Sequence, residues 1–135
     1  MAIPSSQEII EDLEFFDDWE QRYQYIIDLG KHLPAMDDNL KTEDRLVRGC
    51  QSNVWLETQE KDGKLHFEVA SDAIIVNGLL ALVMAAYNDK SPQDILAFDI
   101  DGYFQALDLE RHISPTRGNG LRAIVGKIQG LAKHH

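Results

Sequence analysis

The feature that most constrains the fold is the apolar run AIIVNGLLALVMAAY, residues 73–87. It carries no charged side chain and one strongly polar side chain, Asn77. A membrane-spanning helix needs about 20 consecutive apolar residues, so this run is too short to cross a bilayer. A helix that is apolar all round is buried on every side. We therefore expect 73–87 to form a core helix that the rest of the chain covers.

Helical spacing of apolar residues predicts further helices on both sides of this run. The pattern Ser5-x-x-Glu8 is a capping box that begins a helix over 5–16. Asp17-x-x-Glu20 repeats the start signal for a second helix, which ends near residue 32 before a proline. Shorter helices are expected over 92–97 and 102–107, and a last helix over 121–131. The segment SPTRGNG, 114–120, is expected to be a turn-rich connection before that last helix.

Between the second helix and the core helix the periodicity changes to that of β-strands. Residues 53–60 and 65–71 predict two strands, and Asp62-Gly63 between them is a strong hairpin signal because both residues tolerate positive φ. Leu46–Gly49 adds a short third strand. This order of elements predicts an α+β fold in which a small antiparallel three-stranded sheet packs against helices. With 135 residues and no linker or repeat, we expect a single domain over 1–135.

Composition and charge exclude several classes of partner and site. The formal net charge is −10 at pH 7, and such a surface repels nucleic acid and anionic membranes, so neither is expected as a partner. No three or four Cys or His residues cluster at zinc spacing, so no metal site is expected. The N-terminus lacks the pattern of an export signal, which favours a cytoplasmic protein. The closing His134 and His135 resemble the start of a purification tag and receive no function.

The only cysteine, Cys50, lies in the polar segment VRGCQSNVW, residues 47–55. Gly49 removes a side chain beside it and permits close approach of another group. Gln51 after it can hydrogen-bond a sulfur anion. The thiolate is the reactive form, and cations such as the nearby Arg45 and Arg48 lower a thiol pKa. The alternative is a buried cysteine that behaves as a small hydrophobic side chain.

From the residues alone, three functions for Cys50 stay open. A sulfur or thiol carrier needs one accessible nucleophile and makes the fewest demands on the rest of the chain. A small thiol enzyme needs a general base near the sulfur, for which His32, His66 and His112 are the candidates. The third possibility is a regulator that binds another enzyme without carrying sulfur.

Four segments in order resemble the SufE family of sulfur acceptors, which includes the CsdE branch. They are RYQYIIDLGKHLP (22–34), VRGCQSNVW (47–55), SDAIIVNGLLAL (71–82) and ISPTRGNGL (113–121). SPQDILAFD (91–99) is a fifth, weaker match. Together they span nearly the whole chain, and the combination is specific although each piece alone is weak.

The resemblance implies a partner of a cysteine desulfurase of the SufS or CsdA type in iron–sulfur cluster assembly. In this family the desulfurase uses pyridoxal phosphate to hold sulfur as a persulfide, and the acceptor thiol, here Cys50, carries that sulfur to a cluster scaffold. The acceptor stimulates the desulfurase, is not itself an enzyme and needs no cofactor of its own. The resemblance also implies a fold like that of IscU-type scaffolds. The oligomeric state, a homodimer included, stays open.

Two further positions follow from the resemblance. Asp72 matches a family residue near the cysteine loop, although Ser71 or Asp72 is also expected to cap the core helix. Arg117 matches an arginine at the desulfurase interface or near the sulfur, and its alternative is a solvated loop residue. In many such proteins the resting cysteine is held below the surface and the partner turns it outward. Gly49 is then expected to supply the flexibility.

Overall fold

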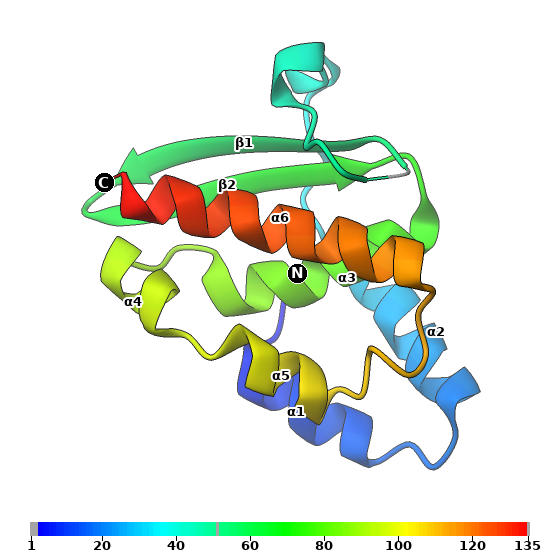
Figure 1. Ribbon diagram of the computed structural model, residues 1–135. Helices are drawn as coiled ribbons and strands as arrows, with labels where there is room; N and C mark the ends of the chain where they lie inside the picture. Colours follow the sequence, from blue (N-terminus) through cyan, green and yellow to red (C-terminus); the bar gives the residue numbers. More distant parts are fainter. Residues whose placement is uncertain (1–2, 51, 135) are drawn as a thin grey trace.

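The computed structural model describes residues 3–50 and 52–134, and its architecture is α+β. The elements, in chain order, are α1 (Ser6–Glu14), α2 (Trp19–Gly30), β1 (Val54–Lys61), β2 (Lys64–Ser71), α3 (Ile74–Tyr87), α4 (Pro92–Ala97), α5 (Ile100–Ala106) and α6 (Pro115–Lys133). Two short 3-10 turns, η1 (Asp38–Leu40) and η2 (Glu43–Arg45), lie in the loop before β1. Figure 1 shows the hairpin over α3 and α6, with this loop projecting beyond it.

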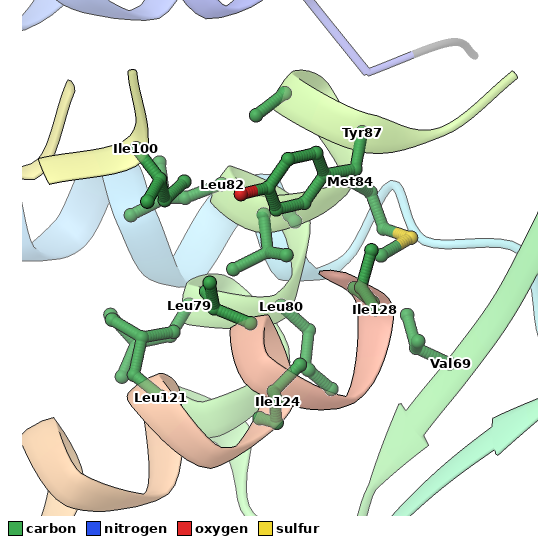
Figure 2. Close-up of a cluster of buried hydrophobic side chains, with 14 of the residues drawn as sticks. Val69, Leu79, Leu80, Leu82, Met84, Tyr87, Ile100, Leu121, Ile124 and Ile128 are labelled. Carbon is green, nitrogen blue, oxygen red and sulfur yellow. The ribbon is translucent and has the colours of Figure 1, made fainter. Parts of the chain in front are cut away.

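The predicted core helix is confirmed as α3. It is buried along most of its length, and its side chains meet those of α6 and β2 (Figure 2). Leu80, Leu82 and Val83 have no exposed surface. On the other side α3 packs closely on α2, where a Cβ at Gly30 would lie 2.6 Å from the backbone nitrogen of Gly78. No helix of the described residues is long and apolar enough to span a membrane.

The polar residue of this run, Asn77, joins α3 to the end of β2. Its side-chain oxygen accepts the Ser71 N–H at 2.9 Å, and its amide donates to the Ser71 carbonyl at 3.1 Å. The expectation that Ser71 or Asp72 caps α3 is wrong, because the N-cap position is Ala73 and has no side-chain cap. The Ser71 hydroxyl instead accepts the Ala73 N–H at 3.2 Å, outside the helix.

The starts of α1 and α4 follow the sequence signals, whereas those of α2, α5 and α6 need correction. Ser5 forms the expected capping box, and α4 occupies the expected residues 92–97. The cap of α2 is Asp18, not Asp17, and its carboxylate accepts the Gln21 N–H at 2.9 Å. Helix α5 runs over Ile100–Ala106 with Asp99 as its N-cap, so it begins before the expected range 102–107. The larger error concerns 114–120, which form the beginning of α6 and not a connection. Ser114 is the N-cap and Pro115 the first helical residue, and this start outweighs the turn tendency of the glycines that follow.

The predicted hairpin is confirmed, with Asp62 and Gly63 at φ 55° and 77° in its turn. Alternate side chains of the strands point into the core, as expected for a sheet covered on one face: Val54, Leu56, Leu65, Phe67 and Val69. The third strand is not confirmed, since among the described residues the sheet has two strands and Leu46 makes one isolated bridge to Trp55. A 3-10 turn directly before Leu46 and a positive φ at Gly49 leave no room for a longer ladder.

Candidate functional site

The cysteine lies in a loop that leads into β1, of which residues 48–50 and 52–53 are described. The base of this loop is hydrogen-bonded to the strand. The Val47 N–H donates to the Val54 carbonyl at 2.9 Å, and Leu46 bridges to Trp55. Arg45 forms an ion pair with Glu57 on the same strand. The loop therefore extends from a fixed base toward the first turns of α6, which run below this end of the sheet (Figure 1).

Cys50 is half-buried against α6. Its Sγ donates to the backbone carbonyl of Gly120 at 3.5 Å, a contact between residues 70 positions apart. The sulfur borders a small cavity of about 60 Å³. The cavity is lined by Cys50, Ser52, Val54, Val76, Leu79, Thr116, Arg117, Gly120, Leu121 and Ile124. Half of these side chains are aliphatic, so the sulfur lies in a mixed environment with apolar and polar sides.

Burial raises the pKa of the Cys50 thiol above its ordinary value of 9.0. A low-dielectric environment disfavours the thiolate, and the hydrogen bond to the Gly120 carbonyl needs the protonated form. The expected contribution of Arg45 is not found, since its guanidinium pairs with Glu57, and Arg48 is exposed. At neutral pH the resting thiol is therefore protonated, and its reactivity is low in this position.

Gly49 allows the loop to pass close to α6. Its φ is 93°, a conformation that residues with a side chain rarely adopt. A Cβ at this position would also lie 3.2 Å from the Cβ of Ala123. Both observations favour glycine here, and the loop lies close to α6 as the sequence led us to expect.

The other predicted site residues lie at different distances from the sulfur. Arg117 is in the first turn of α6, is exposed, and lines the cavity. Asp72 is exposed between β2 and α3, and its backbone N–H donates to the carbonyl of Asn53 at the end of the cysteine loop, at 3.4 Å. Gln51 lies outside the described residues, and nothing is stated of its position.

The three candidate histidine bases lie elsewhere. His66 bonds to Asp89 at 2.8 Å, and His112 stacks on Trp19 with ring centroids 3.9 Å apart. His32 lines a separate surface groove. Among the described residues that line the Cys50 cavity there is no histidine. This arrangement gives the thiol no imidazole base in the resting structure.

Several residues around the sulfur were not found from the sequence. Gly120 contacts Cys50 directly, and Val76, Leu79, Leu121 and Ile124 line the cavity. The available signal for Gly120 was the pair Ser114-Pro115, which resembles the pair Ser91-Pro92 at the start of α4. Recognising it would have placed Arg117 and Gly120 on a helix. The aliphatic residues gave only a core signal.

The fold and this loop define a class: a small α+β protein that places a single thiol between a hairpin and a long helix. The family model described as "SufE: Fe-S metabolism associated domain" matches residues 7–132. The chain therefore belongs to the SufE family, which is associated with iron–sulfur metabolism. The family expected from the sequence segments is confirmed.

Two relatives agree with this assignment, and a solved structure has a similar fold. An uncharacterized SufE-like protein of Rhizobium meliloti (strain 1021) is 41% identical over 133 residues, which covers 96% of this chain and 95% of the relative. A second, from Rhizobium etli, is 42% identical over 98% of this chain and 93% of its own length. The solution structure of a hypothetical protein from Thermus thermophilus has a TM-score of 0.78, 20% identity, and covers 99% of this chain and 97% of that one. The last match concerns the fold alone.

Proposed function

We propose that the protein accepts a sulfur atom from the persulfide of a cysteine desulfurase onto Cys50 and passes it to an iron–sulfur cluster scaffold, raising desulfurase turnover. The observation that carries this proposal is the position of Cys50, half-buried in the loop before β1 beside a cavity with an arginine at its rim. Membership of the SufE family supports it. A partner that docks at this loop can reach a sulfur that is already partly open to solvent.

The transfer is an exchange between sulfur atoms and needs no external oxidant. The Cys50 thiolate attacks the outer sulfur of the desulfurase persulfide, a new S–S bond forms, and the old S–S bond breaks. The desulfurase cysteine leaves as a thiolate and takes up the proton that Cys50 released. The second transfer, to the scaffold, repeats this step with Cys50 as the leaving group. The chemistry is exchange alone, so the protein acts as a carrier and not as an enzyme.

The resting thiol must leave its position before it reacts. Ionisation requires loss of the hydrogen bond to the Gly120 carbonyl and escape from the burial that raises the thiol pKa. The base of the loop is bonded to β1, so the movement we propose is confined to the residues around Cys50, with Gly49 at φ 93° as the hinge. Arg117 at the cavity rim then stabilises the thiolate or the persulfide anion, or contacts the desulfurase.

Asp72 and Gln51 act on the loop in this proposal. The backbone N–H of Asp72 donates a hydrogen bond to the carbonyl of Asn53. A partner that displaces Asp72 therefore also displaces the end of the cysteine loop. Gln51 follows the thiol directly and can hydrogen-bond the exposed sulfur. The protein works in the cytoplasm without a resident cofactor, nucleic acid or membrane, and the pyridoxal phosphate belongs to the desulfurase.

Mass spectrometry tests the proposal. After incubation with a desulfurase and L-cysteine, the peptide that contains Cys50 is expected to gain one sulfur atom, and Cys50→Ser is expected to gain none and to lose stimulation of the desulfurase. Stimulation that survives in Cys50→Ser would identify a regulator that carries no sulfur. Loss of sulfur transfer in His32→Ala, His66→Ala or His112→Ala would instead indicate a thiol enzyme with a histidine base.

Hydrogen exchange tests the movement of the loop. Amides of residues 48–53 are expected to lose protection when a desulfurase binds, whereas the hairpin turn at 62–63 keeps its exchange rate. Identical protection of the cysteine loop with and without the partner would remove the idea that the thiol is turned outward.

A further inference from the structure

The thiol rests against two small residues on one face of α6. Gly120 and Ala123 are one turn apart, and they face Cys50 and Gly49 respectively. A Cβ at Gly120 would lie 3.6 Å from both the Cα and the Sγ of Cys50. The space that a side chain at position 120 would fill is therefore bordered by the cysteine.

Other glycines of the same helix are different. A Cβ at Gly126 or at Gly130 would meet no atom within 4 Å outside its own turn of helix. A glycine in a helix interior costs about 1 kcal/mol relative to alanine. At Gly126 and Gly130 an added methyl would meet no neighbour, whereas at Gly120 it would be in ordinary van der Waals contact with the Cys50 sulfur.

We propose that Gly120 is a positioning residue for the thiol: its missing side chain and its carbonyl oxygen together set the depth at which the Cys50 sulfur rests. The carbonyl accepts the S–H, which holds the thiol in its protonated form. The space beside the bare Cα holds at most a methyl group before a side chain competes with the sulfur. This inference deepens the proposed function and rests on it, because it assigns a residue that keeps the acceptor sulfur unreactive until a partner arrives.

The geometry predicts opposite effects for small and large side chains at position 120. An alanine methyl at 3.6 Å from the sulfur makes an ordinary van der Waals contact and covers the thiol further. A leucine extends beyond that methyl into the space of the sulfur, so Cys50 must turn away from the helix. The side chain then loses its hydrogen bond and its partial burial.

The test is the alkylation rate of Cys50 by iodoacetamide, measured as a function of pH with no desulfurase present. Gly120→Leu is expected to react roughly tenfold faster than the unchanged protein at neutral pH, since one lost hydrogen bond is worth up to about a factor of ten. Its pH midpoint is expected to fall toward the ordinary value for a thiol. Gly126→Leu is the matched control on the same helix and is expected to react at the unchanged rate.

Gly120→Ala is the second variant in this test, and its methyl group fits beside the Cys50 sulfur. Its alkylation is expected to be slower than that of Gly126→Ala by a factor of about two or more, because its methyl group covers the sulfur. Circular dichroism and thermal unfolding verify that each variant is folded, and Gly120→Met replaces the leucine variant if that one does not fold. Equal rates for Gly120→Ala and Gly126→Ala, or a folded Gly120→Leu or Gly120→Met with an unchanged rate and midpoint, would overturn the proposal.

This experiment separates the inference from the proposed function. Alkylation reports the position of the thiol without sulfur transfer. If the variants behave as expected and the Cys50 peptide gains no sulfur from a desulfurase, the proposed function fails and the positioning role of Gly120 stands. If sulfur is transferred and the alkylation rates do not differ, the inference about Gly120 fails alone.

Discussion

The two turns at the ends of β1 both contain a glycine with positive φ, but they differ in what holds them in place. The glycines are Gly49 at 93° in the cysteine loop and Gly63 at 77° in the hairpin turn. A Cβ at Gly63 would meet no atom within 4 Å, whereas one at Gly49 would press on Ala123 of α6. The hairpin turn is built from its own residues, and the cysteine loop is held by a helix from the far end of the chain.

This difference fits a structural role for the hairpin turn and the exchange chemistry that we propose for the cysteine loop. A turn defined by local preferences keeps its form whatever happens elsewhere. A loop held by contacts with another element has a second arrangement whenever those contacts are replaced by a partner's.

Core truncations at the two ends are expected to cost similar stability and to differ at the thiol. Leu79 lines the Cys50 cavity, and Leu65 is fully buried at the hairpin end. Leu79→Ala and Leu65→Ala should each lower the free energy of unfolding by about 2–5 kcal/mol in urea denaturation. Only Leu79→Ala is expected to speed the alkylation of Cys50. A similar increase in Leu65→Ala would show that the thiol responds to global stability and not to its cavity.

The paired glycine substitutions test the turns themselves. Gly63→Ala should cost about 1–2 kcal/mol, because alanine disfavours positive φ and nothing crowds its methyl. Gly49→Ala should cost about 1–3 kcal/mol, since strain is joined by contact with Ala123. Denaturation measures both, and only Gly49→Ala is expected to change the alkylation rate. If Gly63→Ala changed that rate as well, the two turns would be coupled through β1.

Removing helix caps should give a smaller effect. The Ser114 hydroxyl accepts the Arg117 N–H at 3.2 Å, and the Ser91 hydroxyl accepts the Asp94 N–H at 3.1 Å. Ser114→Ala and Ser91→Ala should each cost about 1 kcal/mol. Hydrogen exchange is expected to show looser first turns of α6 and a more reactive thiol in Ser114→Ala alone. Equal thiol rates in both variants would mean that the start of α6 does not control the cysteine loop.

The titration of the thiol should have the smallest effect on stability. Burial raises the pKa of Cys50, so its alkylation midpoint is expected above the ordinary value of 9.0. A reference thiol at the hairpin, Lys64→Cys in a Cys50→Ser background, is exposed and should titrate near the ordinary value and react faster at neutral pH. If the alkylation midpoint of the reference thiol were the same as that of Cys50 in the unchanged protein, the contrast between the two turns would be contradicted.

The same shift has a defined sign in stability. The folded state favours the protonated thiol, so the contribution of Cys50 is fully present below the ordinary pKa and is lost as the pH rises through the raised value. Cys50→Ser lacks this contribution at any pH. The unfolding free energy of the unchanged protein, measured relative to that of Cys50→Ser, should therefore fall as the pH rises above 9 and stay constant below it.

The hairpin and the core helix were predicted from sequence because their signals are local. Asp62-Gly63 specifies its turn without help from other residues, and the length and composition of 73–87 admit a buried helix. The start of α6 was missed because Gly118 and Gly120 are strong turn signals. The Ser-Pro start and the burial of Leu121 and residues beyond it outweigh them in the folded chain.

The site was predicted less completely than the fold for the same reason. Cys50 and Gly49 follow from one short segment, and the structure places them together against α6. The cavity needs aliphatic residues from β1, α3 and α6, which no local pattern assigns to one place. The expected cap at Asp72 was wrong because the chain leaves β2 through Ser71 and Asn77, a contact between side chain and backbone that spacing alone does not specify.

The 70-residue separation between Cys50 and Gly120 has a consequence for biosynthesis. A ribosome makes the cysteine long before residues 115–133 exist, and pairings between distant segments form late in folding. The nascent chain therefore exposes a bare thiol to cellular oxidants and metals until its last helix docks.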